Sequence, residues 1–391
     1  MKIQRFTSVR EMVDRLDPSY PIFVIWPDLI REKARTFIDH FHGEVLYAVK
    51  CNPHPLVLET LYDAGIRSFD TASLPEIARV RELLPEAVCY FNHPVKGRGA
   101  LDTAADVYGL EDFVIDHVVE LDKIEQVVGT DVTVSVRFAT SGTGAVYDLS
   151  AKFGASIEES IVLLRDVARR GMKPALTFHV GSQCVDVGAY RNALGQAKTI
   201  IDAAGVDVAH LDIGGGFPAP YAGADVDLEA MLNEIAQTVK ELGLTMPLLC
   251  EPGRALVADG CSLLLQVHLR KGDDLYVNEG IYGCLSEVNI GKFVMPARAF
   301  GRGHSLKGEP RAFRVFGPTC DSLDVLDCPF LVPDDIQEGD WIEVGLVGAY
   351  SLALATGFNG FVTEAVVAVE GARRWVDEVM PIAEEAVLNP G

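Results

Sequence analysis

The feature that most constrains the fold is a series of eight short apolar segments, mostly separated by amphipathic helical segments. The eight segments lie between residues 45 and 254 and read VLYAVK, SFDTAS, VCYFN, DFVIDH, VTVSVRFAT, LTFHVGS, HLDIGGG and LLCEPGR. Amphipathic segments such as SIVLLRDVARRG lie between them. Alternating strands and helices are typical of parallel βα units, and eight such units predict closure into a barrel.

The pattern changes after residue 258. The segments FRVFG, WIEVGLVG and FVTEAVVAVEG are short alternating strands with Gly and Pro turns, which indicates a mainly antiparallel sheet. We therefore expect an α/β chain, with a (β/α)8 TIM-type barrel over residues 21–258. A C-terminal antiparallel β-domain over residues 259–391 would follow, and residues 1–20 would add a strand to it.

Composition limits the classes of partner. The 391 residues suffice for a barrel of about 250 residues and a second domain. A net charge of −22 repels phosphate backbones and anionic lipid, so we expect neither nucleic acid nor membrane partners. The acidic surface would modestly favour a cationic small molecule, although solubility alone explains it as well. Eight scattered cysteines without zinc spacing or a signal peptide predict reduced thiols, no metal site and a cytoplasmic protein.

Polar residues and glycines gather at the carboxyl ends of the predicted barrel strands. They are Lys50, Asp70, Arg137, His179, Ser182, Gly214, Gly215, Gly216, Glu251 and Arg254. Taken singly, such residues are more often solvated loop charges, structural histidines or tight turns. Because the carboxyl ends of barrel strands converge on one mouth, the joint pattern predicts a site there.

The types of residue indicate a phosphorylated aldehyde cofactor. A partly desolvated Lys50 can form a Schiff base with an aldehyde. The three glycines of LDIGGGFP let backbone N–H groups cradle a phosphate, and Arg254 would supply countercharge. Together these groups predict pyridoxal 5′-phosphate.

Glu251 indicates the reaction. A carboxylate beside the pyridine nitrogen keeps it protonated and makes the ring a strong electron sink, which suits loss of CO₂, whereas an arginine there would suit racemisation. In GPTCDSLD, the Cys320 thiol can reprotonate the carbon that lost CO₂, and Asp321 can pair with a cationic substrate tail. The plainer interpretations are a buried cysteine and a turn aspartate.

These motifs resemble one family. YAVKCNPHP, FDTASLPEI, LSAKFGAS, FHVGSQC, LDIGGGFP, EPGR, GPTCDSLDVL, GDWIEVGLVGAY and GFNGF are together similar to the eukaryotic-type ornithine decarboxylases, which have the alanine-racemase-like fold. The resemblance runs from about residue 45 to 361, nearly the whole chain.

The resemblance implies a role for each matching residue. Lys50 would carry the cofactor, with Asp70 and Glu76 near it and Arg137 lining the site. His179 would stack on the ring and Glu251 would hold its nitrogen. The phosphate would be bound by Ser182, Gly215, Gly216, Arg254 and Tyr350. Cys320 would donate the proton and Asp321 would bind the distal amine, both in the neighbouring subunit's site, so the working unit would be a homodimer. Tyr282 and Phe358 would border the substrate, Lys152 and Asp324 would bridge the subunits, and residues 141–151 would form a mobile loop.

One departure from the family concerns the substrate. After GIYG the family usually has a Tyr-Asp pair whose Asp helps to bind the distal amine, but ungapped counting places Ile290 and Gly291 there. Glu287 could compensate from a shifted position. The expected reaction is decarboxylation of a basic L-amino acid, first L-ornithine to putrescine for polyamine synthesis, then L-lysine to cadaverine. Arginine, a related diamino acid or a derivative of one stays open.

Three other functions stay open. A racemase of this fold is disfavoured by Glu251 and the GPTCD segment. A catalytically inactive regulatory homologue, like the antizyme inhibitors, would typically lose cofactor residues that this chain keeps. A pyridoxal-phosphate carrier protein resembles the barrel alone, so the β-domain argues against it.

Overall fold

The computed structural model describes residues 3–140, 152–222, 224 and 226–371. The chain divides into two compact units. The barrel unit comprises Lys33–Pro218 and Val226–Ala255, and the sheet unit comprises Met1–Glu32, Ala219–Asp225 and Leu256–Gly391. The segment 141–151, expected to be a mobile loop, lies outside the described residues.

The barrel unit contains a closed ring of parallel strands in the order β10-β3-β4-β5-β6-β7-β8-β9. Their bounds are β3 (Glu44–Ala48), β4 (Ser68–Thr71), β5 (Val88–Phe91), β6 (Asp112–Ile115), β7 (Thr133–Arg137), β8 (Lys173–Thr177), β9 (Leu211–Asp212) and β10 (Leu248–Cys250). All eight overlap the apolar segments of the sequence, so the predicted barrel is confirmed, although β8 begins before the expected segment LTFHVGS and shares only Leu176 and Thr177 with it.

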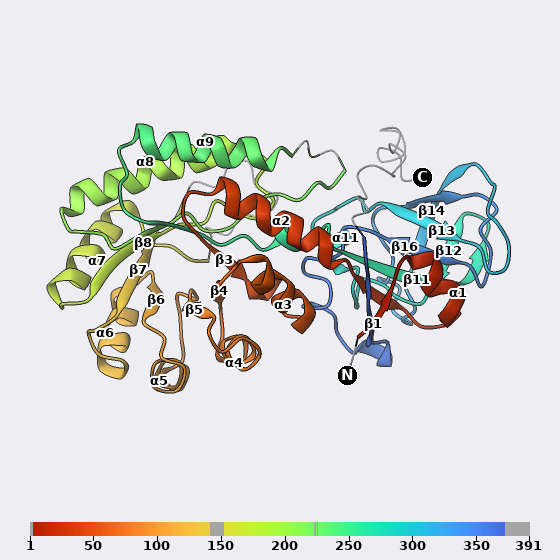
Figure 1. Ribbon diagram of the computed structural model, residues 1–391, viewed down its shortest axis with the longest axis horizontal. Coiled ribbons are helices and arrows are strands. Elements are labelled where there is room, and N and C mark those ends of the chain that lie inside the picture. The colour runs from red at the N-terminus through yellow and green to blue at the C-terminus, as the bar shows by residue number, and fades with distance from the viewer. Residues whose placement is uncertain (1–2, 141–151, 223, 225, 372–391) are drawn as a thin grey trace. The chain divides into compact units, whose positions relative to one another are not determined.

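Helices follow the strands and lie outside the ring, as Figure 1 shows for α3 to α9. Their bounds are α2 (Pro27–His40), α3 (Pro55–Ala64), α4 (Leu74–Leu83), α5 (Arg98–Asp106), α6 (Val118–Val127), α7 (Ile157–Arg169), α8 (Val187–Ala204), α9 (Leu228–Glu241) and α10 (Arg254–Val257). The predicted strand over residues 45–50 ends earlier, at Ala48, and Lys50 lies in the 3₁₀ turn η1 (Val49–Cys51).

Local sequence explains these elements. In β7 the first four residues are buried, because a parallel strand covered by helices on one side and the barrel interior on the other has no solvent face. Helix α7 begins after Ser156, whose hydroxyl accepts from the Glu159 backbone N–H while the Glu159 carboxylate accepts from the Ser156 N–H. This reciprocal cap satisfies two donors that the helix itself leaves unpaired.

The sheet unit is built on a mixed sheet. Its strands are β1 (Gln4–Phe6), β2 (Ile22–Ile25), β11 (Cys261–Lys271), β12 (Asp274–Val277), β13 (Ala297–Phe300), β14 (Pro310–Phe316), β15 (Phe330–Pro333), β16 (Trp341–Val344) and β17 (Ala365–Val369). Most neighbours are antiparallel, as predicted, but among the described strands β1–β17, β17–β2 and β12–β14 are parallel. The short helices are α1 (Val9–Leu16) and α11 (Ser286–Ile290), with the turn η2 (Phe358–Gly360).

The N-terminal segment belongs to this sheet. β1 pairs with β17, as expected for the first twenty residues. β2 pairs with β11 and β17, although the expected boundary at residue 21 assigned it to the barrel domain. The reason is packing: Ile22 and Val24 join Met12, Trp341 and Val367 in the apolar core of the sheet unit.

Candidate active site

The carboxyl ends of the barrel strands bring the predicted polar side chains to one end of the barrel. Arg137 ends β7, Lys50 and His179 each follow a strand by two residues, and Glu251 follows β10 directly. These four residues are spread from position 50 to position 251 of the sequence, and closure of the parallel ring places them together.

Lys50 forms an ion pair with a buried carboxylate. Its Nζ lies 2.6 Å from Asp70 Oδ2 at the end of β4. Asp70 is 2% exposed in its side chain, whereas the Lys50 side chain is 42% exposed. The amine is therefore held in place while remaining accessible from solvent.

Glu251 is the centre of a group of acidic side chains. Loss of hydration raises its pKa well above the usual value, and the negative charges of Asp212 and Asp70 raise it further, while Lys50 opposes them. Loss of hydration also raises the pKa of Asp212 to about 6. Asn92 donates from Nδ2 to Glu251 Oε1. The two carboxyl groups of Asp212 and Glu251 thus lie close together in surroundings that favour retention of a proton.

Sequence reasoning missed Asn92 and Asp212. Asn92 follows β5, and Asp212 ends β9. Both carry the signal that identified the other residues, a polar side chain at the carboxyl end of an apolar strand, so the same criterion would have found them.

His179 is held as a neutral ring. The Gly181 N–H donates to His179 Nδ1 at 3.0 Å, and the Thr140 hydroxyl donates to the His179 carbonyl at 2.9 Å. Loss of hydration lowers the pKa of His179 well below its usual value, with Arg137 and then Lys50 adding to the effect. A neutral imidazole whose Nδ1 accepts carries its hydrogen on Nε2. It therefore offers a flat, uncharged face.

The glycine segment after β9 leaves no space for side chains. Gly214 and Gly216 have φ values of +68° and +105°, which non-glycine residues rarely adopt. A Cβ on Gly214 would lie 2.0 Å from the Phe178 carbonyl oxygen, and one on Gly215 would lie 3.1 Å from His179 Nε2. The glycines therefore let this segment pack closely against the backbone that follows β8 and β10 and against His179.

Four other predicted residues belong to the barrel unit. The Arg137 guanidinium lies 5.7 Å from the Phe153 ring, and loss of hydration lowers its pKa although Glu251 and neighbouring aspartates oppose the change. Glu76, in the first turn of α4, accepts from the Ala72 N–H at 2.7 Å. Ser182 follows β8, and Arg254 is buried at the first residue of α10.

The sheet unit holds a second group of predicted residues. The Tyr282 hydroxyl donates to Asp321 Oδ2 at 2.6 Å, and the Tyr282 and Phe358 rings are 4.8 Å apart. Cys320 is exposed, and its N–H and Sγ both donate to Asn359 Oδ1, at 3.2 and 3.3 Å. The exposed thiol differs from the usual buried cysteine.

A cavity of about 480 Å³ lies within the sheet unit beside this group. Its lining includes Cys320, Asp321, Asp324 and Phe361. Asp324 is buried and accepts from the Ile281 N–H at 3.0 Å and from the Thr319 hydroxyl at 2.7 Å. Tyr350 lies elsewhere in this unit with a φ of +56°.

The segment that departs from the family forms α11. Glu287 is 5% exposed, whereas Ile290 is 59% exposed. The one carboxylate of this helix is therefore buried, and the residue at the ungapped family position faces outward.

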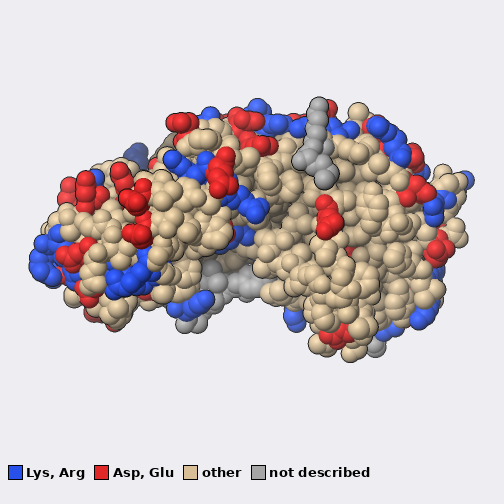
Figure 2. Space-filling model, turned by 90° about the horizontal axis from the view of Figure 1, so that it is seen from below, with Lys and Arg blue, Asp and Glu red and all other residues tan. Residues whose placement is uncertain are grey.

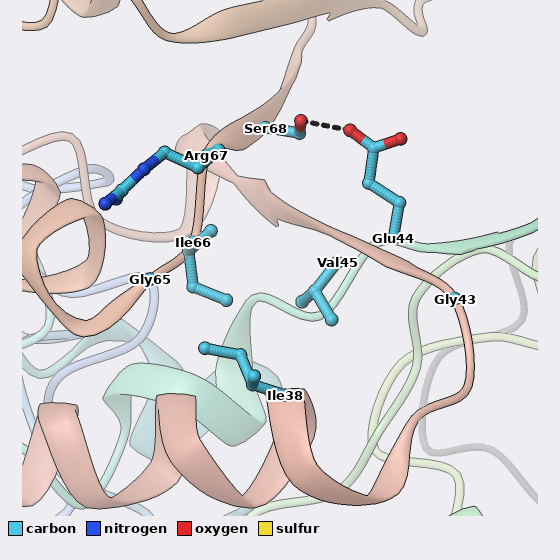
Figure 3. A pocket seen from close by; sticks show the side chains of 8 residues that line it. All are labelled: Ile38, Gly43, Glu44, Val45, Gly65, Ile66, Arg67 and Ser68. Atoms are coloured by element: carbon cyan, nitrogen blue, oxygen red, sulfur yellow. Dashed lines mark hydrogen bonds between the residues drawn. The ribbon is translucent and has the colours of Figure 1, made fainter.

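Another hollow lies at the opposite, amino end of the barrel strands (Figure 3). This cavity of about 190 Å³ is lined by Ile38, Gly43, Glu44, Val45, Gly65, Ile66, Arg67 and Ser68. The side chains of Ile38, Val45 and Ile66 point toward one another, and Ser68 donates to Glu44 at the rim. The Ser68 hydroxyl is engaged by Glu44 and the centre is apolar, so we do not assign chemistry to this cavity.

Three further observations concern metal ions, membrane helices and surface charge. No group of three or more His, Cys, Asp or Glu side chains suited to a metal ion occurs among the described residues. Within the same residues, no helix has the length and apolarity needed to cross a bilayer. In the barrel unit, acidic and basic side chains are interspersed on the face seen in Figure 2, without a continuous basic field.

Comparisons with known proteins agree with this geometry. Residues 28–258 match the family described as "Pyridoxal-dependent decarboxylase, pyridoxal binding domain". A lysine/ornithine decarboxylase of Selenomonas ruminantium is 36% identical over 354 residues, 87% of each chain. The arginine decarboxylase of Paramecium bursaria Chlorella virus, solved with agmatine, superposes with a TM-score of 0.83 at 27% identity, covering 93% of this chain and 99% of that one. Antizyme inhibitor 2 of Xenopus laevis is 31% identical over 85% of this chain and 77% of its own.

Proposed function

Because the chain belongs to the pyridoxal-dependent decarboxylase family, we propose that it decarboxylates a basic L-amino acid, with L-ornithine as the first candidate and L-lysine as the second. The observation that carries the proposal is Glu251, a carboxylate at the barrel end that also holds Lys50 and the glycine segment. The similarity to lysine/ornithine and arginine decarboxylases supports a basic substrate.

The residues fit pyridoxal 5′-phosphate. Lys50 supplies the amine that would hold the aldehyde carbon, and Gly215 and Gly216 with Ser182 and Arg254 would bind the phosphate. Glu251 would hold the ring nitrogen and His179 would face the ring. When bound, the cofactor supplies an electron sink for the electrons left at Cα as CO₂ departs.

The chain's own groups prepare and complete this reaction. Asp70 orients the Lys50 amine, at 2.6 Å. The neutral His179 ring excludes water from one face without adding charge. The Cys320 thiol would donate a proton to the carbon that lost CO₂, and its exposure permits it to serve a neighbouring subunit.

We propose that the working unit is a homodimer. The surface around Cys320 exposes apolar side chains, with Leu323 69%, Phe358 42% and Phe361 42% exposed. Neighbouring exposed apolar side chains mark interaction surfaces, and a second copy of the chain would cover them. Cys320 and Asp321 would then complete the partner's site.

The distal amine of the substrate would meet carboxylates. Asp321 already accepts from Tyr282, which lowers the pKa of the aspartate and keeps it charged. Glu287 is the second candidate, because it is the buried carboxylate of α11. Loss of one carboxylate from such a pair costs about 1–3 kcal/mol in recognition of a cationic tail.

The test is CO₂ release by the cofactor-loaded protein from L-ornithine, L-lysine, L-arginine and meso-diaminopimelate, with the D-forms as controls. Release from ornithine or lysine is the expected result. Release from arginine or diaminopimelate alone would contradict the proposed substrates but support the proposed decarboxylation. Recovery of racemised substrate without CO₂ would show that the reaction is racemisation and not decarboxylation.

The shared site has its own test. Lys50→Ala and Cys320→Ala proteins should each be inactive, and mixing them should restore activity, since one hybrid site has both side chains. Mass measurements should first demonstrate that subunits have exchanged. If activity still does not recover, the dimer-shared site is contradicted.

The similarity to antizyme inhibitor 2 favours one alternative, a regulatory homologue without catalysis. An absorbance band near ~420 nm that disappears in Lys50→Ala would show cofactor joined to Lys50 and would disfavour this alternative.

A further inference from the structure

The inference concerns Asn92, which is not among the residues assigned above to the cofactor, the substrate or the proton. It follows β5, and its backbone N–H donates to the Thr71 carbonyl at 3.0 Å. Its side-chain amide donates from Nδ2 to Glu251 Oε1. Asn92 is thus a neutral donor in contact with the carboxyl group that would hold the cofactor nitrogen.

Glu251 needs such a donor because of its neighbours. Asp212 on β9 and Asp70 on β4 repel its negative charge, while Lys50 and Arg137 attract it. Glu251 also shares a hydrogen bond with Asp212, so its carboxyl group is drawn both toward that aspartate and toward the cations. The amide hydrogen bond opposes rotation of this group, because charge-assisted hydrogen bonds are stronger than neutral ones.

The bond also decides which oxygen can carry a proton. An amide N–H can only donate, so Oε1 is held as an acceptor. A proton retained by the Asp212–Glu251 pair is thereby confined to Oε2 or to Asp212. Asn92 anchors one oxygen of Glu251, and the carboxyl group also shares a hydrogen bond with Asp212.

The segment after Asn92 is itself anchored. The fully buried Lys96 Nζ donates to the His93 carbonyl at 3.0 Å and to the Val114 carbonyl at 2.6 Å. It also pairs with Glu120 on α6 at 3.0 Å, and the Lys96 N–H donates to the same carboxylate. The loop that carries Asn92 is therefore tied to β6 and α6, which makes the position of the amide reproducible.

We propose that Asn92 is a positioning residue that fixes the orientation of the Glu251 carboxyl group and so secures the proton on the cofactor's ring nitrogen. The inference rests on cofactor binding at Lys50 and Glu251 and does not depend on which amino acid is the substrate.

The test uses pyridoxal 5′-phosphate labelled with ¹⁵N in the ring, bound to wild type, Asn92→Leu and Asn92→Ala. Leucine keeps the shape of asparagine without its donor, and alanine removes the side chain. The ring nitrogen's ¹⁵N chemical shift is followed over about pH 6–9 in the resting protein. We expect its deprotonation midpoint to fall by about one pH unit in both variants, a tenfold change in proton affinity.

Two further readouts separate positioning from a loss of structure. Cofactor affinity should weaken about tenfold, and kcat should fall roughly tenfold with the best substrate while KM changes less than about threefold. Asn233→Ala, on the exposed side of α9, is the control and should change neither quantity. Thermal unfolding confirms that each variant is folded before loading.

The outcomes are distinct. A wild-type nitrogen midpoint and affinity in either folded variant would overturn the proposal. The nitrogen signal is recorded without substrate. A failure to find CO₂ release would therefore contradict the proposed substrates, while the ¹⁵N titration would still test the role of Asn92.

Discussion

The two ends of the barrel can be compared directly, because both hold titratable side chains away from water. At the amino end, the Tyr90 hydroxyl donates to Glu44 at 3.2 Å, and Ser135 lies 3.1 Å from His210 Nε2. Burial raises the pKa of Asp112 to about 6 and lowers that of His210 to about 4. At the carboxyl end, the pKa values of Glu251, Asp212 and His179 are shifted as well.

The ends differ in the sign and arrangement of their charges. The carboxyl end combines Lys50 and Arg137 with three carboxyl groups and a closely packed glycine segment. The amino-end group named above consists of carboxyl, hydroxyl and imidazole groups, and Lys173 acts on Asp112 from the exposed start of β8. A shifted pKa therefore does not by itself distinguish a functional site from a structural group of buried polar side chains. The combination of Lys50 and Arg137 with several buried carboxyl groups does distinguish the carboxyl end.

The largest difference between the ends is expected for lysines. Lys50→Ala should lower kcat at least roughly a thousandfold, because the amine that would hold the cofactor is lost. Lys173→Ala, at the exposed start of β8, should leave kcat within about twofold. CO₂ release at saturating cofactor measures both. Equal losses would mean that the two ends are coupled and would break the comparison.

Glycines give the next largest difference. Gly214→Ala adds a Cβ 2.0 Å from the Phe178 carbonyl at positive φ, and we expect a loss of about 3 kcal/mol in unfolding free energy. Gly171→Ala, before β8, also has positive φ but meets nothing within 4 Å, so about 1–2 kcal/mol should be lost. Urea unfolding of both proteins decides. Equal losses in unfolding free energy would show that backbone strain alone, without the close contact to Phe178, explains the need for glycine at position 214.

The smallest effect is a gain in stability at the amino end. The pKa of Asp112 rises from 3.8 to about 6 on folding, so ionisation opposes folding as pH increases between these values. Asp112→Asn removes this cost and should stabilise the protein by roughly 1–2 kcal/mol near pH 7.5, with the gain vanishing below about pH 4. Unfolding free energies at both pH values, with exposed Asp102→Asn as control, measure it. A loss at neutral pH would show that the charge is stabilising.

The barrel and most of its site were predictable because both depend on local pattern. Each barrel strand is an apolar run, and the chain direction alone assigns Lys50, Glu251 and the glycines to one end. The location of β2 was not predictable, because an isolated apolar strand carries no information about which sheet its edges will join. The parallel pairs within the second sheet escaped prediction for the same reason.

The sequence by itself determined the eightfold alternation, the residues at the strand ends and the types of chemistry they permit. Only the tertiary structure decided that Asn92 donates to Glu251 and that Asp212 shares its surroundings. It also decided that Glu287 is buried while Ile290 is exposed. The physical reason is that residue type sets what a group can donate, accept or ionise, whereas closure of the chain sets its partner and its distance from water.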